Sequence, residues 1–169
     1  MGKAGYVWNL KSPLGPIGVG YQENAVVCLQ IGPFAQEKTA ETMQSLGYDI
    51  QNKSHPTGAI LERELLEYFE GQRTMFSIQP RFYGTPFQIQ VWKTLCRVPY
   101  GKTLSYGELA ARSGRPKAAR AVGMIMGRNR IPIIAPCHRI VAAGGSLGGF
   151  GYGLEVKRKL LQLEGSLTV

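Results

Sequence analysis

The chain has 169 residues, enough for one large domain or two small ones with a buried core. Hydrophobic residues make up 44% of it and charged residues 18%, a composition that excludes an intrinsically disordered protein. No apolar run approaches the length of a membrane span, and the N-terminal "MGKAGYVWNLKSPLG" lacks the apolar core of a signal peptide. We therefore expect a cytoplasmic protein that makes no membrane contact.

Charge is distributed unevenly along the chain. Residues 1–80 hold 6 basic and 8 acidic side chains, whereas residues 81–169 hold 14 basic and 3 acidic ones, so the net charges are −2 and +11. An asymmetry of this size indicates a polyanionic partner for the second half, most simply nucleic acid. A basic surface that serves only solubility is the alternative.

The chain contains three cysteines, Cys28, Cys96 and Cys137. An odd number without the close spacing of metal ligands argues against a disulfide framework and against a zinc site. We expect no metal and no cofactor. Cys28 and Cys96 each lie among apolar residues and are predicted to be small, buried hydrophobic side chains.

The first 80 residues are predicted to form a small α/β unit. Short apolar stretches over residues 5–32, interrupted by "SPLGP" and "QEN", indicate a hairpin or a small antiparallel meander. Helices are predicted over residues 35–47 and over residues 57–72, where apolar residues recur at helical spacing. His55 lies beside a proline in a polar segment and is interpreted as a solvated loop residue. Nothing in this unit has the pattern of a catalytic site.

A passage rich in proline and glycine, "IQPRFYGTP", marks the boundary between two domains, which we place at residues 1–82 and 83–169. The segment that follows it, "PFQIQVWKTLCRVPYGK", is predicted to begin as a helix. Phe87, Val91 and Leu95 lie along one face of that helix, and "VPYGK" ends it.

Residues 104–129 have the pattern of a helix-turn-helix. Ser105 and Glu108 have the spacing of a capping box, "SGRP" supplies a tight turn, and Pro116 suits the first position of a second helix. Many helix pairs of this kind bind nothing. Because this pair lies in the half with a charge of +11, the DNA-binding interpretation is favoured, and the small alanines of "KAARAVG" would let the helix approach a groove closely.

The segment "IIAPCHRIVAAGG" places a thiol beside an imidazole, after a short apolar run that is predicted to anchor the segment in the core. Thiolate is the strongest nucleophile that a side chain provides, and an ordinary thiol needs a base or a positive environment to form it at neutral pH. Cys137 is therefore a candidate nucleophile with His138 as its base. Adjacent residues on an extended strand point to opposite faces, so on a strand the two side chains would not face each other directly.

Three segments together resemble the O6-alkylguanine-DNA alkyltransferases, also called methylated-DNA–protein-cysteine methyltransferases. They are "FQIQVWKTLCRVPYGKTLSYGELAARSGRPKAARAVG", "IIAPCHRIVAAGGSLGGFGYG" and "VKRKLLQLEG", which lie in the family's order over residues 85–165. The resemblance implies an N-terminal α/β domain with a small antiparallel sheet, and a mostly α C-terminal domain with a helix-turn-helix. The first 80 residues match the family's variable N-terminal domain only loosely.

The resemblance also implies an activity. Family members flip an O6-alkylguanine out of double-stranded DNA and transfer its alkyl group irreversibly to the cysteine of the motif at residues 136–139, once per molecule. O4-alkylthymine is a further candidate substrate, and a monomer is expected. In the family, a water bridges the cysteine and the histidine, and a glutamate lies behind the histidine. Those positions are Cys137, His138 and Glu164 here, a set with nucleophile, base and orienting group.

Other roles follow from the resemblance position by position. Arg120 matches the arginine that fills the gap left by the flipped base, and Tyr106 matches a tyrosine that helps to rotate the nucleotide and donates a proton to the leaving guanine. Asn129 matches an asparagine that ties the recognition helix to the active-site turn. The expected DNA-contacting residues are Arg120, Tyr106, Lys117, Ala118, Ala119 and Arg128. The expected pocket and supporting residues are Asn129, Pro136, Arg139, Phe150, Gly151 and Tyr152.

Three positions depart from the family's pattern. Arg130 stands where proline is usual, Phe150 replaces a pocket tyrosine, and Tyr152 occupies a position where a small residue is expected. For these three positions, as for the other candidate residues, the alternative is a purely structural role, because an arginine on the surface or an aromatic residue in a packed contact can be present without taking part in binding or catalysis.

Three other functions are alternatives to alkyl transfer. A damage sensor of the same fold would lack the cysteine, which is present here. A cysteine hydrolase would leave the basic helix pair unexplained, and a transcription regulator would leave "PCHR" unexplained.

Overall fold

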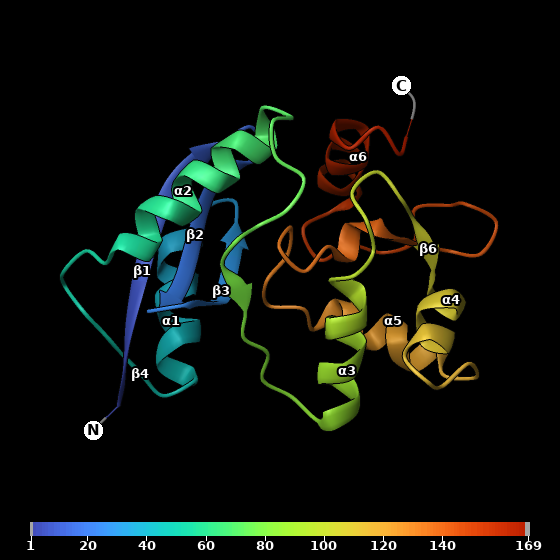
Figure 1. Ribbon diagram of the computed structural model, residues 1–169, viewed down its shortest axis with the longest axis horizontal. Helices are drawn as coiled ribbons and strands as arrows, with labels where there is room; N and C mark the ends of the chain where they lie inside the picture. The colour runs from blue at the N-terminus through green and yellow to red at the C-terminus, as the bar shows by residue number, and fades with distance from the viewer. Residues whose placement is uncertain (1, 168–169) are drawn as a thin grey trace. The chain divides into compact units, whose positions relative to one another are not determined.

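A computed structural model describes residues 2–167 and is shown in Figure 1. The chain divides into two compact units, of which the first ends at Arg81 and the second begins at Phe82. Over the described residues, no helix is both long enough and apolar enough to cross a membrane.

The first unit is built on a five-stranded sheet with the order β4-β1-β2-β3-β5. Its strands are β1 (Lys3–Ser12), β2 (Gly15–Gln22), β3 (Ala25–Ile31), β4 (Tyr48–Ile50) and β5 (Gln79–Pro80). The first three form the predicted antiparallel meander, but β4 pairs with β1 and β5 pairs with β3 in parallel. The sheet is therefore mixed and not purely antiparallel. The two edge strands each follow a helix, and a helical crossover is the connection that permits parallel pairing.

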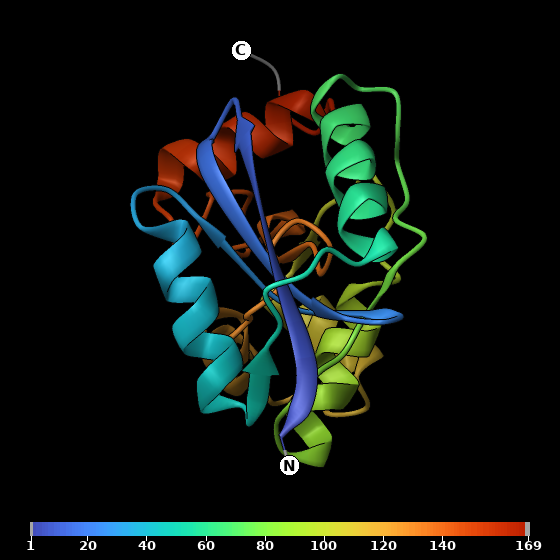
Figure 2. The same cartoon turned by 90° about the vertical axis from the view of Figure 1, so that its left-hand side faces the viewer.

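Two helices cover opposite faces of this sheet, α1 (Ala35–Ser45) and α2 (Pro56–Phe69), which confirms both predicted helices (Figure 2). A Cβ atom on Gly18 of β2 would lie 2.6 Å from the Ala35 carbonyl oxygen, so only glycine lets α1 approach so closely. On the other face, Gly58 of α2 packs in the same way against Trp8 and Tyr21. Alternation along the strands places these contacts on opposite sides.

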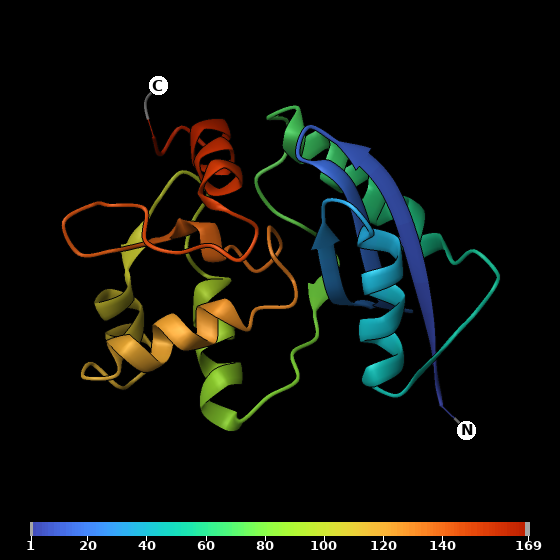
Figure 3. The same cartoon turned by 180° about the vertical axis from the view of Figure 1, so that it is seen from behind.

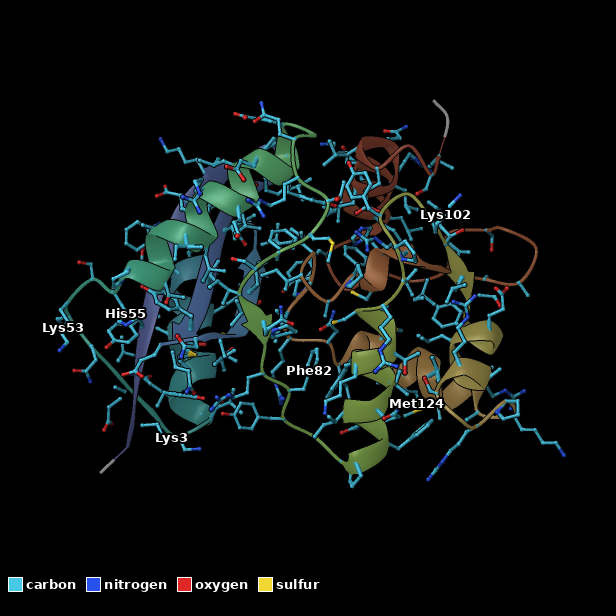
Figure 4. The ribbon with its side chains drawn as sticks, viewed as in Figure 1. Lys3, Lys53, His55, Phe82, Lys102 and Met124 are labelled. Atoms are coloured by element: carbon cyan, nitrogen blue, oxygen red, sulfur yellow. The ribbon has the colours of Figure 1, made fainter. Side chains whose placement is uncertain are left out.

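His55 is not the solvated loop residue that was predicted. It is the N-cap of α2: its Nδ1 accepts a hydrogen bond from the Thr57 backbone N–H at 3.3 Å, and its ring centroid lies 4.9 Å from that of Tyr6 (Figure 4). The half-buried imidazole therefore caps the N-terminus of α2 and packs against an aromatic ring.

The second unit is mostly helical, as predicted. It contains α3 (Pro86–Leu95), α4 (Tyr106–Arg112), α5 (Ala119–Gly127) and α6 (Leu154–Leu163), with a 3-10 turn, η1 (Cys137–Arg139), and a short parallel pair, β6 (Leu104–Ser105) and β7 (Ile140–Val141). The predicted capping box is confirmed, since the Ser105 hydroxyl accepts from the Glu108 N–H at 3.1 Å and the Glu108 carboxylate accepts from the Ser105 N–H at 2.7 Å.

The second helix of the pair begins later than predicted. Pro116 and Lys117 form a turn, closed by a 2.9 Å hydrogen bond from the Ala118 N–H to the Arg115 carbonyl, and Ala119 is the first helical residue. Figure 3 shows α4 and α5 side by side. The Trp92 indole of α3 donates to the Ile125 carbonyl at 3.2 Å and ties α3 to α5.

The two cysteines outside the motif, Cys28 and Cys96, differ in their burial. Cys28 is buried, as predicted, whereas Cys96 is exposed, which corrects the prediction for that residue. Cys96 follows the last residue of α3 and lies off the row formed by Val91, Trp92 and Leu95, which faces the core. Neither Cys28 nor Cys96 forms a disulfide bond.

Candidate active site

The segment from Ile131 to Ile140 is buried throughout, which confirms that the apolar run anchors the motif in the core. Ile133 has φ 73°, a left-handed conformation that costs a β-branched residue about 1–3 kcal/mol. The side chain is only 1% exposed, so the surrounding packing holds the strained backbone in place. The chain can thereby reverse sharply just before the cysteine.

Cys137 lies in a 3-10 turn and not on a strand. The Cys137 N–H donates to the Ala135 carbonyl at 2.8 Å, and the Arg139 N–H donates to the Pro136 carbonyl at 3.0 Å, with Pro136 as the N-cap. The strand-based argument for the directions of Cys137 and His138 therefore does not apply. A turn with three residues per revolution nevertheless sends consecutive side chains in different directions.

Glu164 joins the two residues that follow the cysteine. Its Oε1 lies 2.7 Å from His138 Nε2, and both of its oxygens accept from the Arg139 guanidinium, at 2.8 and 2.9 Å. Arg139 also donates to the Val98 carbonyl at 2.6 Å. Burial alone would raise the pKa of Glu164, but the hydrogen bonds from His138 and Arg139 outweigh it and hold that pKa well below its ordinary value. The carboxylate is therefore ionised at neutral pH.

His138 is neutral at neutral pH, because burial lowers the pKa of its imidazole and the attraction of Glu164 only partly opposes this. With a carboxylate at Nε2, the N–H belongs on that nitrogen, which leaves a lone pair on Nδ1. Nδ1 is buried and has no hydrogen-bond partner among residues 2–167. The ring thus presents one unsatisfied basic atom inside the protein, as a general base requires.

The thiol of Cys137 is protonated in this environment. Burial raises its pKa, while a hydrogen bond from Asn129 and the charge of Lys157 lower it. Asn129 follows the C-cap of α5. Its Nδ2 donates to the Ala135 carbonyl at 2.8 Å and its Oδ1 accepts from the Ile131 N–H at 3.1 Å. One side chain therefore connects the end of α5, the buried turn and the thiol.

Lys157 of α6 was missed in the sequence. It is fully buried, and its Nζ donates to the Ile140 carbonyl at 2.5 Å and to the Gly149 carbonyl at 3.2 Å. Burial lowers its pKa to about 8, and the opposite charge of an ionised Cys137 would raise it. The spacing of Lys157, Leu160, Leu161 and Glu164 along one helix face was the signal, since it places a lysine and a glutamate on the buried side.

Tyr106, the first residue of α4, lies beside the glycine-rich segment "GGSLGGFGYG", residues 144–153. A Cβ atom on Gly148 would lie 2.9 Å from its hydroxyl oxygen, so glycine permits this contact. Burial raises the pKa of Tyr106, a hydrogen bond with the Gly149 backbone lowers it, and the proximity of Cys137 raises it further. The hydroxyl therefore keeps its proton and lies near enough to the thiol to sense its charge.

The remaining predicted residues are not part of this buried cluster. Arg120 is exposed on α5, Lys117 on the turn before it and Arg128 at its C-cap, while Ala118 and Ala119 at the start of the helix are half-buried. Phe150 and Tyr152 pack against each other with ring centroids 6.0 Å apart, and Gly151 between them is exposed. Arg130 approaches the Tyr83 carbonyl at 3.5 Å. Among the described residues, no group of three or more His, Cys, Asp or Glu side chains could hold a metal ion.

The lowered pKa of His138 predicts a loss of stability in acid. Below pH 6.5 the unfolded chain binds a proton at this imidazole more strongly than the folded chain does, so the free energy of unfolding falls as pH falls. The slope approaches about 1.4 kcal/mol per pH unit. Denaturant titrations between about pH 6.5 and pH 5, above the range in which carboxylates titrate, measure it.

A matched pair of variants assigns this slope. His138→Asn should remove it, whereas His55→Asn, which replaces the chain's other histidine and keeps a good N-cap, should retain it. An unchanged slope in His138→Asn would show that other groups cause the acid sensitivity.

Comparison with known proteins finds close relatives. The profile of the family described as "6-O-methylguanine DNA methyltransferase, DNA binding domain" matches residues 86–166. The methylated-DNA–protein-cysteine methyltransferase of Mycobacterium tuberculosis is 40% identical over 157 residues, which cover 93% of this chain and 90% of that protein. The constitutive enzyme of that name from Bacillus subtilis is 38% identical over 160 residues, with 94% of each chain covered.

Solved structures agree with the sequence comparison. A crystal structure of M. tuberculosis OGT in complex with DNA matches with a TM-score of 0.81 at 36% identity, over 95% of this chain and 93% of that chain. An O6-methylguanine methyltransferase structure from the same organism matches with a TM-score of 0.80, also at 36% identity, over 96% and 93% of the two chains.

Proposed function

Because this chain belongs to the methylated-DNA–protein-cysteine methyltransferases, which repair DNA by alkyl transfer, we propose that the sulfur of Cys137 receives the alkyl group. The observation that carries this proposal is the buried cluster of Cys137, His138 and Glu164 on the segment that the family profile covers. The substrate is an O6-alkylguanine in double-stranded DNA, with O4-alkylthymine as a second candidate.

The transfer is a displacement at saturated carbon. His138 Nδ1 takes the thiol proton through a bridging water, and the Sγ lone pair forms a bond to the alkyl carbon. The bond from that carbon to O6 breaks, and its electron pair leaves with the guanine, to which the Tyr106 hydroxyl donates a proton. Tyr106 regains its proton from the His138 relay, so the thiol proton ends on the released base.

The charges around the thiol favour its ionisation. Lys157 and Arg139 contribute two positive charges and Glu164 one negative charge, so the buried cluster carries a net +1 while the thiol is neutral. When His138 accepts the thiol proton, the cluster keeps its net charge of +1, and the new thiolate is accompanied by positive charges on His138, Arg139 and Lys157. A buried anion is favoured when an opposite charge is already in place, so the charge of Lys157 opposes part of the rise in the Cys137 pKa that burial causes.

The product is a thioether, which is not a leaving group under these conditions. No group in the cluster could remove the alkyl chain again, so each molecule reacts once, without a cofactor. The protein is therefore consumed as a stoichiometric reagent, and in this proposal it acts as a monomer. It works where the DNA lies, and in a cell without a nucleus that compartment is the cytoplasm.

The DNA interface in this proposal is the helix-turn-helix formed by α4 and α5, in the C-terminal domain that begins near residue 83. Arg120, Lys117 and Arg128 are exposed there with positive charges available for the phosphates or the base stack. Arg120 fills the gap left by the flipped base, and Phe150, Gly151 and Tyr152 line the path to Cys137. The N-terminal α/β domain has a structural role. A sensor without transfer activity is disfavoured because the nucleophile and its base are both present.

Mass spectrometry tests the proposal directly. The protein is mixed with a short duplex that carries one O6-methylguanine, and intact and peptide masses are measured. We expect one added CH2 per molecule, on the peptide that contains Cys137, and no second addition with excess duplex. An unchanged mass together with retained binding to the duplex would contradict alkyl transfer and support a damage sensor.

A further inference from the structure

The outward face of α5 has an apolar side chain at its centre. Arg120, Met124 and Arg128 follow each other at intervals of four residues and therefore lie on one face of the helix. The opposite face, formed by Val122, Ile125 and Met126, is buried. Met124 lies between the two arginines in the sequence and is 64% exposed. Figure 4 labels its side chain.

A single exposed apolar residue is ordinary on a protein surface, so the residues around Met124 decide whether its exposure indicates a binding surface. Residues 113–128 contain no Asp or Glu, and the exposed side chains three or four residues from Met124 are those of Arg120, Ala121 and Arg128. A second copy of this chain that docked through the same face in a symmetric dimer would bring the same positive charges against it. A polyanion is the partner that complements both arginines, and contact with such a partner would cover Met124.

We propose that Met124 makes an apolar contact with duplex DNA, against the deoxyriboses and base edges of the groove that α5 enters, while the flanking arginines engage the charged backbone or the base stack. The inference rests on the proposed function, in which α5 faces DNA. Methionine is unbranched and polarisable, so it fits irregular surfaces of varied sequence, and methionine is among the apolar side chains that proteins insert against base steps. A repair protein that must inspect every sequence needs such a tolerant contact.

The test separates an apolar contact from a charge contact by its salt dependence. Affinity for an undamaged duplex is measured over a range of salt concentrations for the wild type, Met124→Ala, Met124→Leu and Arg128→Ala. Met124→Ala should bind about tenfold more weakly with the slope of log K against log salt unchanged, because no phosphate contact is lost. Arg128→Ala should reduce the magnitude of that slope by about 0.9. Met124→Leu should restore most of the affinity.

Met75→Ala is the matched control, since Met75 is 77% exposed in the first unit and lies outside α5. It should bind DNA as the wild type does. If the wild type binds DNA and Met124→Ala has the same affinity as Met75→Ala, the inference is overturned. A changed salt slope in Met124→Ala, or self-association of the wild type that Met124→Ala removes, would also overturn it. Failure of the wild type to bind any duplex would instead contradict the proposed function.

Discussion

Replacing Cys137 by serine should abolish alkyl transfer while leaving the fold intact. Serine has nearly the same volume as cysteine, so the buried turn from Ile131 to Ile140 loses no packing. A serine hydroxyl is far less acidic and less polarisable than a thiol, and the neutral His138 could not generate an alkoxide able to displace guanine from a saturated carbon. Incubation with a duplex that carries radiolabelled O6-methylguanine should leave no label on the protein.

The other two cysteines provide internal controls for this experiment. Cys28→Ser removes a buried thiol from the first unit, and Cys96→Ser removes an exposed one from the second. Both variants should accept one methyl group per molecule. Label that persists in Cys137→Ser and disappears in Cys96→Ser would show that the exposed thiol is the acceptor and that the buried cluster has another purpose.

Local signals in the sequence predicted much of the second unit. The capping box at Ser105 and the apolar spacing along α3 are short-range patterns, and both elements formed where they were expected. The parallel edge strands β4 and β5 could not be predicted in this way, because their pairing is decided by partners far away in the chain. The start of α5 was misplaced because the turn at Arg115–Ala118 satisfies its own hydrogen bond before the helix begins.

The site shows the same division between local and distant information. The motif drew attention to Cys137 and His138, and the family resemblance supplied Glu164. No local pattern indicates that Arg139 donates to that carboxylate. From its neighbours in the sequence a charged residue is predicted to be exposed, whereas the structure buries Arg139. Lys157 was missed for the same reason, although its place in the apolar row of α6 was visible. Buried charges are rare, and a prediction based on frequencies will usually assign them to the surface.

Replacing Glu164 by glutamine should destabilise the second unit strongly. Glutamine keeps the size of the side chain but removes the negative charge, so the Arg139 guanidinium would remain buried without its counter-ion, and an amide NH2 would face donors from His138 and Arg139. Breaking a buried ion pair in this way costs about 3–5 kcal/mol. Alkyl transfer by the residual folded protein should also slow, because one uncharged amide oxygen must serve the donors of both His138 and Arg139 and therefore fixes the His138 N–H on Nε2 less firmly.

Glu155→Gln is the matched comparison within the same helix. Glu155 pairs with Lys159 at 3.2 Å, but its side chain is 78% exposed, and an exposed pair contributes at most about 1 kcal/mol. The chain has two tryptophans, Trp8 in the first unit and Trp92 in the second, so a Trp8→Phe background makes Trp92 fluorescence report on the unfolding of the second unit alone. In that background we expect Glu164→Gln to lose several times more stability than Glu155→Gln. Equal losses would mean that water or a rearranged Arg139 replaces the carboxylate, and that Glu164 is not the centre of the buried charge cluster.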